Sequence, residues 1–389
     1  MPNKEMLLIP GPTPVVDEIY EALASETYAH TDPRFVKIFE ESLKVTKEMF
    51  NNQNGEVFVV AGSGTLAMEM AIVNTVAPGE KILVVSHGYF GDRFIQLGKA
   101  FGIQVEALQS EWGKRVCPKE VEKKLAEGGF KAVTVTHVDT STGVVADLDA
   151  LVPVVKKAGA LFILDGVCAT AAIEENFEKE YGAPENKIDV VLTGSQKAIG
   201  VPPGLAIIAF GPKALAAREA LGQIPAYYAD IKMWLPIMQN PSKYYATPAV
   251  NMIYAYGKGM EIVKREGFEK RYRRHAALGK AVRAALATYG LNALASEEVA
   301  APTLSCILYP QGLDDAAFRK ILMGKGMVVA GSLAALAGKA FRIGHMGNTT
   351  TEQFVKAVTY IGEALNELGH KADINAAVAK FNEVCAANN

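Results

Sequence analysis

Lys197 has the clearest chemical setting of any residue in this chain. It follows an apolar segment, residues 189–192, that is typical of a short buried strand, and a polar turn over residues 193–196. This spacing places Lys197 at the carboxyl end of a strand, where ligands bind in open α/β sheets. Glycines and prolines follow closely and keep a helix from starting at once. A solvated loop lysine is the alternative, and the residues that accompany Lys197 argue against it.

Two features upstream supply what a reactive lysine needs. Asp165 follows a second apolar run, residues 160–164, so its carboxylate can accompany a buried cationic nitrogen. A third strand, residues 56–60, leads into the glycine turn Ala61–Thr65 and a helix over residues 66–76. Free N–H groups and the positive helix end at such a turn hold a phosphate. A lysine that forms a Schiff base, an acid and a phosphate anchor are the parts that pyridoxal phosphate chemistry needs.

The glycine turn also fits a second cofactor class. Residues 62–67 match the dinucleotide fingerprint G-x-G-x-x-A, which is a weak signal on its own. A dinucleotide site requires an acid at the end of the next strand to bind the ribose. That strand, residues 81–85, ends in Ser86, His87 and Gly88 instead. A dehydrogenase is therefore the weaker interpretation.

Six short motifs occur along the chain in a fixed order. They are LIPGPTP (8–14), AGSGT (61–65), HVDTSTG (137–143), DGV (165–167), GSQK (194–197) and FRIG (341–344). In order and spacing they resemble the class V aminotransferases of fold type I, with the alanine–glyoxylate and serine–pyruvate branch as the nearest. The resemblance extends from residue 7 to about residue 365. Six motifs together are far more specific than any one of them.

The resemblance implies roles around the ring of the cofactor, pyridoxal 5'-phosphate. Lys197 is the Schiff-base lysine and the general acid and base, and Asp165 keeps the pyridine nitrogen protonated. Phe90 and Val167 pack on opposite faces of the ring, although both also fit an ordinary core position. Thr140 is implied to bind near the ring hydroxyl.

The resemblance also implies the phosphate and substrate contacts. The phosphate residues are Ser63, Gly64, Thr65 and Gln196, with Tyr244 and Thr247 reaching across from the partner of a homodimer. One active site then contains residues of both chains of the dimer. Arg342 is implied to bind the substrate carboxylate through two parallel N–H···O bonds, whereas a surface arginine on an edge strand is the alternative. Gly11 and Tyr28 are placed near the substrate, while the contact of Tyr28 and the role of Asp139 are left open.

Composition is that of a soluble globular protein. The chain has 389 residues, half of them apolar, and 40 basic against 42 acidic residues. Nothing in this balance favours binding to nucleic acid or to an anionic membrane. We expect a cytoplasmic protein, because the sequence shows no signal peptide and no apolar run of about 20 residues. The scattered cysteines and histidines predict neither a disulfide nor a metal site.

Strand and helix signals alternate through the first two thirds of the chain and predict an α/β fold with a largely parallel sheet. The resemblance implies the pyridoxal phosphate transferase fold type I, with a mostly parallel seven-stranded sheet in a large domain and a smaller α+β C-terminal domain. We expect an N-terminal arm over residues 1–20, a large cofactor-binding domain over 21–250 and a small domain over 251–389.

The resulting hypothesis is a ping-pong aminotransferase. It moves an amino group between alanine, serine or glycine and a small 2-oxo acid, glyoxylate or pyruvate. A pyridoxal phosphate lyase or cysteine desulfurase is the first alternative, but those enzymes place His before the lysine and a nucleophilic Cys upstream of the arginine motif. This chain has Gln196 before Lys197, and residues 331–338 contain no Cys. A non-catalytic scaffold is a remote alternative.

Overall fold

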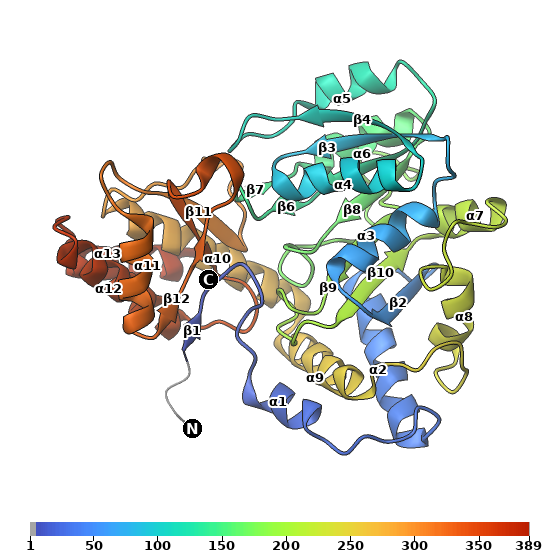
Figure 1. Cartoon of the computed structure of the whole chain (residues 1–389), viewed down its shortest axis with the longest axis horizontal. Helices are drawn as coiled ribbons and strands as arrows, with labels where there is room; N and C mark the ends of the chain where they lie inside the picture. Colours follow the sequence, from blue (N-terminus) through green and yellow to red (C-terminus); the bar gives the residue numbers. More distant parts are fainter. Residues whose placement is uncertain (1–4, 389) are drawn as a thin grey trace.

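A seven-stranded sheet forms the centre of the larger part of the molecule (Figure 1). The computed structural model describes residues 5–388. From edge to edge the strands are β2 (Glu56–Ala61), β10 (Leu205–Phe210), β9 (Val190–Gly194), β8 (Leu161–Asp165), β5 (Phe130–Thr136), β3 (Lys81–Ser86) and β4 (Gln104–Gln109). β10 runs antiparallel to both neighbours, and the other neighbouring pairs are parallel. The predicted mostly parallel, seven-stranded sheet is confirmed.

The central strands are continuous apolar runs because helices cover both faces of the sheet. Every residue of β8, β9 and β10 is buried, as expected for strands between two helical layers. The helices around the sheet are α3 (Gly64–Val73), α4 (Tyr89–Ala100), α5 (Pro118–Leu125), α6 (Leu148–Lys157), α7 (Pro212–Ala220) and α8 (Ile231–Gln239). The return strand expected over residues 205–209 is β10.

Helices α1 (Asp17–Leu23) and α2 (Pro33–Met49) precede the sheet and were not predicted. The start of α2 nevertheless carries a standard signal. The Asp32 side chain accepts the N–H of Arg34 at 2.8 Å, and proline occupies the first helical position. The apolar face of α2 packs against α9 (Val250–Glu266).

A second hydrophobic cluster forms the C-terminal part of the molecule, coloured orange and red in Figure 1. Its sheet has the order β11 (Leu304–Leu308), β14 (Ala340–Gly344), β13 (Ala330–Gly331). The helical elements are α10 (Phe268–Ala287), α11 (Asp315–Gly324), the short 3₁₀ helix η1 (Ala334–Leu336), α12 (Thr351–Glu367) and α13 (Ile374–Asn388). These helices and the antiparallel strands make a small α+β unit, as the resemblance implied.

The N-terminal segment joins the two parts. Strand β1 (Met6–Leu7) pairs in parallel with β12 (Met327–Val328) of the small unit. The next residues stay on that unit, since Gly344 donates its N–H to the Leu8 carbonyl at 2.8 Å. Thr13 then donates its N–H to the Gln196 carbonyl of the large unit at 3.0 Å.

Helix α9 belongs by packing to the large hydrophobic cluster, because its buried residues lie against α1 and α2. The domain limit expected at residue 250 places this helix in the small domain instead. Gly267, with φ of 88°, separates α9 from α10. A limit near Gly267 follows the packing more closely than one at residue 250.

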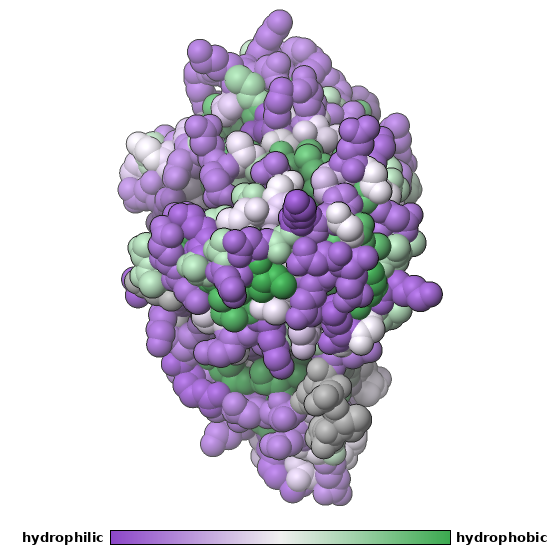
Figure 2. All heavy atoms as spheres, turned by 90° about the vertical axis from the view of Figure 1, so that its left-hand side faces the viewer, coloured by the Kyte–Doolittle hydropathy of each residue, from purple (hydrophilic) through white to green (hydrophobic). Residues whose placement is uncertain are grey.

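The outer surface of the small unit is mostly hydrophilic, with hydrophobic residues in small groups (Figure 2). Within residues 5–388, no helix has the length and apolar character needed to cross a bilayer. The same residues contain no group of three or more histidine, cysteine or acidic side chains arranged to hold a metal ion.

Candidate active site

A cavity of about 140 Å³ lies where β5, β8 and β9 end. Nine of the residues predicted from the sequence line it, and they come from separate loops and helix ends. They are Ser63, Gly64, Thr65, Phe90, Thr140, Asp165, Val167, Gln196 and Lys197. Five further residues that the sequence did not indicate complete the lining, namely Met68, Arg93, Thr136, Val138 and Cys168.

Lys197 is held by the N-terminal segment. Its Nζ donates to the Pro10 carbonyl, and its own carbonyl accepts the Thr13 hydroxyl at 2.8 Å. Gly11 lies directly against the lysine side chain, because a Cβ added there would be 2.4 Å from the Lys197 Cδ. Its φ of +113° also favours glycine. Gly11 therefore belongs to this site through its contact with the lysine.

Asp165 lies at the end of β8 and is almost fully buried. Its carboxylate accepts one hydrogen bond, from the Val167 N–H at 3.0 Å. The pKa of this carboxyl is raised to about 7, mainly by burial and also by the nearby charges of Asp139 and Glu175. A cationic group against Asp165 would reverse that shift. The position thus suits a protonated ring nitrogen.

The first turn of α3 offers free donors to an anion. Ser63 occupies the N-cap position, but its side chain does not cap the helix. Two buried side-chain oxygens at the cavity, Gln196 Oε1 and Thr136 Oγ1, have no hydrogen-bond partner in the described part of the chain. Buried polar groups are normally paired, so these atoms indicate a missing polar ligand. The residues present therefore fit a phosphorylated heterocycle such as pyridoxal phosphate.

Asp139, whose role the sequence left open, fastens two loops of the site together. It lies in the short β6 (Val138–Asp139), which pairs with β7 (Val144–Val145). One oxygen accepts the Phe90 and Gly91 N–H groups at 2.9 and 3.1 Å, and the other accepts the Ser141 N–H and hydroxyl. The aromatic at the start of α4 is thereby fixed beside the loop that carries Thr140.

Arg342 reaches the site from β14 of the small unit. Its Nη1 donates to Thr140 Oγ1 at 3.2 Å and its Nε to the Gly331 carbonyl at 3.0 Å. Within residues 5–388, no carboxylate lies within ion-pair distance of this guanidinium. The arrangement leaves a half-buried cation beside Thr140 that can bind a carboxylate.

A buried polar cluster behind Asp165 was missed from the sequence. Glu175 lies 2.7 Å from His137 Nδ1 and accepts the Thr170 hydroxyl at 2.5 Å. A Cβ on Gly166 would be 2.6 Å from the Glu175 carboxylate. The cluster thus packs against the turn that follows Asp165, and no local motif in the sequence signals it.

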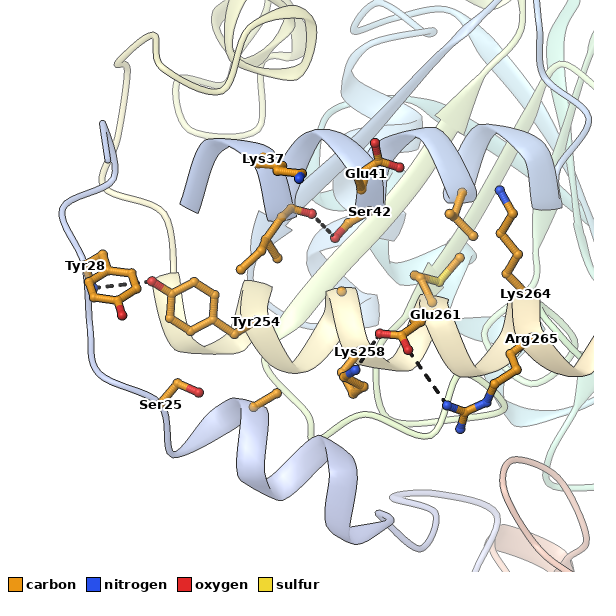
Figure 3. Close-up of a pocket in the computed structure, with 15 residues that line it drawn as sticks. Ser25, Tyr28, Lys37, Glu41, Ser42, Tyr254, Lys258, Glu261, Lys264 and Arg265 are labelled. Carbon is orange, nitrogen blue, oxygen red and sulfur yellow. Dashed lines mark hydrogen bonds and ion pairs between the residues drawn. The ribbon is translucent and has the colours of Figure 1, made fainter. Parts of the chain in front are cut away.

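Five predicted residues do not line this cavity. Gly11 and Arg342 contact residues that do, whereas Tyr244, Thr247 and Tyr28 lie elsewhere. Tyr244 is 64% exposed, hydrogen-bonds to Thr247 at 3.4 Å and packs on the His30 ring at 5.2 Å. Tyr28 lines a separate groove of about 690 Å³ between α1, α2 and α9 (Figure 3). The Arg34 guanidinium lies 3.6 Å from the centre of its ring. Within a single chain, therefore, these tyrosines do not join Lys197.

The aminotransferase class-V family model matches residues 13–358. The chain belongs to this family. An uncharacterized aminotransferase of Methanocaldococcus jannaschii is 36% identical over 368 residues, which cover 94% of each chain. Alanine–glyoxylate aminotransferase 1 of Saccharomyces cerevisiae is 34% identical over 366 residues, covering 89% of this chain and 92% of its own.

Solved structures agree with the family. The crystal structure of pyridoxamine–pyruvate aminotransferase from Mesorhizobium loti superposes with a TM-score of 0.92 at 26% identity and covers 100% of both chains. The protein is an aminotransferase. The lyase, dehydrogenase and scaffold alternatives are not favoured.

Replacing Asp165 should change how the stability of this aminotransferase depends on pH. In the cofactor-free protein, the folded state keeps a proton on Asp165 between about pH 4 and 7 that the unfolded chain releases. The stability that Asp165 contributes is therefore present at low pH and lost as the pH rises through 7. Relative to Asp165→Asn, the wild type should lose up to about 4 kcal/mol over this range, since one pKa unit corresponds to about 1.4 kcal/mol.

Urea unfolding of both cofactor-free proteins at a series of pH values between 4 and 8 measures this difference. Parallel stability curves for wild type and Asp165→Asn would show that the carboxyl titrates normally and that its burial has no electrostatic consequence.

Proposed function

We propose that this aminotransferase uses pyridoxal 5'-phosphate to exchange the amino group of alanine, serine or glycine with glyoxylate or pyruvate. The observation that carries this is one cavity that brings Lys197, Asp165 and the uncapped start of α3 together. The alanine–glyoxylate relative and the pyruvate-dependent structural neighbour support small substrates. Two half-reactions at one site give ping-pong kinetics.

When bound, pyridoxal phosphate supplies an electron sink that stabilises negative charge at the substrate α-carbon. Lys197 Nζ is the amine that would take the α-proton of the donor in the first half-reaction and give a proton to the α-carbon of the acceptor in the second. It must first leave the Pro10 carbonyl that it now contacts. Asp165 supplies a negative charge at the far end of the site, where a cationic nitrogen keeps it ionised.

Arg342 is proposed to orient the substrate. A guanidinium binds a carboxylate through two parallel hydrogen bonds, so it fixes the direction of the α-carbon as well as the charge. Its Nη1 is now bound only to the Thr140 hydroxyl, a neutral partner that a carboxylate can replace. Phe90 and Val167 then limit the position of the ring from two sides.

The working unit is proposed to be a homodimer with shared sites. Tyr244 and Thr247 are exposed together and away from the Lys197 cavity of their own chain, as residues that serve a second chain would be. The groove between α1, α2 and α9 adds apolar surface on the same part of the molecule, including Tyr28 (Figure 3). We propose a cytoplasmic location, because all four cysteines are free. We propose no nucleic-acid or membrane partner.

A panel of donors and acceptors tests the function. Alanine, serine, glycine and aspartate are paired with glyoxylate, pyruvate and 2-oxoglutarate in the presence of pyridoxal phosphate. The highest kcat/KM is expected for a small donor with glyoxylate or pyruvate. Lys197→Ala should lower kcat at least about a hundredfold, because general acid–base catalysis is lost, while circular dichroism shows an intact fold.

Arg342→Ala in the same panel should lower kcat/KM for donor and acceptor alike, because a charge-assisted contact is removed. The expected loss of transition-state stabilisation is about 2 to 4 kcal/mol. Arg319→Ala is the matched control, since that half-buried arginine pairs with Asp315 near the same sheet. Wild-type turnover by Lys197→Ala, or a clear preference for 2-oxoglutarate and aspartate, would contradict the proposed chemistry or substrates.

A mixed dimer tests the shared site. Tyr244→Phe should weaken cofactor binding by roughly 1.5 to 3 kcal/mol, the contribution of a hydrogen bond to a charged group. Pairing a Lys197→Ala chain with a Tyr244→Phe chain should leave one wild-type site, if Tyr244 serves the partner. Activity per dimer should then be about half that of wild type with unaltered cofactor affinity. If Tyr244 serves its own chain, the mixed dimer shows the weakened affinity instead.

A further inference from the structure

Arg93 is a cavity residue to which neither the motifs nor the mechanism above assigns a function. It extends from the first turns of α4 into the lining of the Lys197 cavity. Its guanidinium carbon lies 4.7 Å from the centre of the Phe90 ring. Its Nη1 donates to the Thr65 hydroxyl at 3.4 Å. Arg93 thus stands between the aromatic wall of the cavity and the start of α3.

The charge of Arg93 is not balanced by any carboxylate of the described chain. No ion pair within residues 5–388 involves this guanidinium, and its hydrogen bond to Thr65 is a long contact with a neutral group. By contrast, Arg218, a buried arginine of the large unit, pairs with Asp230 at 2.7 Å. A partly buried cation without a counter-ion is unfavourable unless a ligand supplies the negative charge.

The start of α3 adds positive potential at the same place. Four N–H groups at a helix start lack intrahelical partners, and the helix dipole is positive there. α4 has its start neutralised by the carboxylate of Asp139, which accepts two of its N–H groups. Among residues 5–388, no carboxylate accepts hydrogen bonds from the first turn of α3, and no side chain caps it. Arg93 and the uncapped helix therefore face one region that lacks a negative charge.

We propose that Arg93 is a phosphate-binding residue of this site, which joins the first turn of α3 in holding the 5'-phosphate of the cofactor. This deepens the proposed function and rests on it. A guanidinium can give two hydrogen bonds to a phosphate, whereas an N–H group at the helix start gives one. The contact with Thr65 places the guanidinium beside the helix turn, and stacking on Phe90 restricts its motion.

Two other roles for Arg93 make different predictions. A guanidinium that only supports the Phe90 ring would affect binding of the ring itself, with or without a phosphate. A guanidinium that binds the second carboxylate of a dicarboxylic donor would affect the KM for aspartate and leave cofactor affinity unchanged.

Equilibrium binding of two ligands to the cofactor-free protein distinguishes these roles. The ligands are pyridoxal 5'-phosphate and pyridoxal, which share the ring and aldehyde and differ by the phosphate. Dissociation constants are read from the change in visible absorbance or protein fluorescence. Arg93→Gln should weaken pyridoxal phosphate binding about 10- to 100-fold, the range of a charge-assisted contact. Pyridoxal affinity should change less than twofold.

Two variants serve as controls. Lys99→Gln removes the same charge from an exposed position at the end of α4 and should leave both affinities unchanged, so it excludes a general loss of positive charge. Arg93→Lys keeps the positive charge but loses the planar guanidinium. Its affinity for pyridoxal phosphate should lie between those of Arg93→Gln and wild type. Thermal unfolding of each cofactor-free variant confirms that the fold is retained.

The outcomes separate this inference from the function on which it rests. If wild type binds pyridoxal phosphate and Arg93→Gln binds it equally well, Arg93 is not a phosphate residue and the proposed function is untouched. Equal weakening of both ligands assigns Arg93 to the ring, and a raised KM for aspartate alone assigns it to substrate; both overturn the phosphate role. If wild type binds no pyridoxal phosphate, both proposals fail.

Discussion

The parallel pairing of β8 with β9 is the constraint on which the site depends. Asp165 is paired with Leu192 across these strands, so the turn after β8 and the turn after β9 open on the same edge of the sheet. Lys197 and Asp165 are thereby brought to one cavity although 32 positions separate them in sequence. The strands that lead to them, β8 and β9, are fully buried and held by ladder hydrogen bonds. A shift of one residue in this pairing would turn the Asp165 side chain to the opposite face.

The second constraint is the close approach of the N-terminal segment. A Cβ on Gly344 would lie 2.4 Å from the Ile9 carbonyl, and one on Gly11 would meet the lysine side chain. Glycine at both positions lets the N-terminal segment run from the small unit to Lys197. This segment also hydrogen-bonds to β12 and to Gly344 at the end of β14. Lys197 and the strand that carries Arg342 are therefore tied to one structural element. Arg342, which we propose to orient the substrate, and Lys197, the proposed reactive amine, are thus held in a fixed relation across two hydrophobic cores.

Local patterns predicted most of this arrangement. The strand before Asp165, the glycine turn before α3 and the turn before Lys197 each lie within about ten residues of sequence. The largely parallel sheet and the grouping of these three features followed from such patterns, whereas the other site residues were implied by the family resemblance. The roles of Asp139 and Glu175 could not be predicted, because each has a partner far away in sequence: Phe90 lies 49 positions from Asp139, and His137 lies 38 positions from Glu175. Helix α2 was missed despite its Asp-Pro start. Tyr244 and Tyr28 lie outside the cavity of their own chain, and no pattern within one chain can place them in a second one.

The central claim is that Lys197 is the residue that binds pyridoxal phosphate covalently in this cavity. Borohydride reduction of the holoenzyme, followed by proteolysis and mass spectrometry, tests it directly, because reduction makes the carbon–nitrogen bond permanent. We expect the pyridoxyl phosphate mass on the peptide that contains Lys197, at close to one label per chain, and loss of that label in Lys197→Ala. Labelling of another lysine at that stoichiometry, or no label in the wild type, would contradict the assignment of this cavity as the cofactor site.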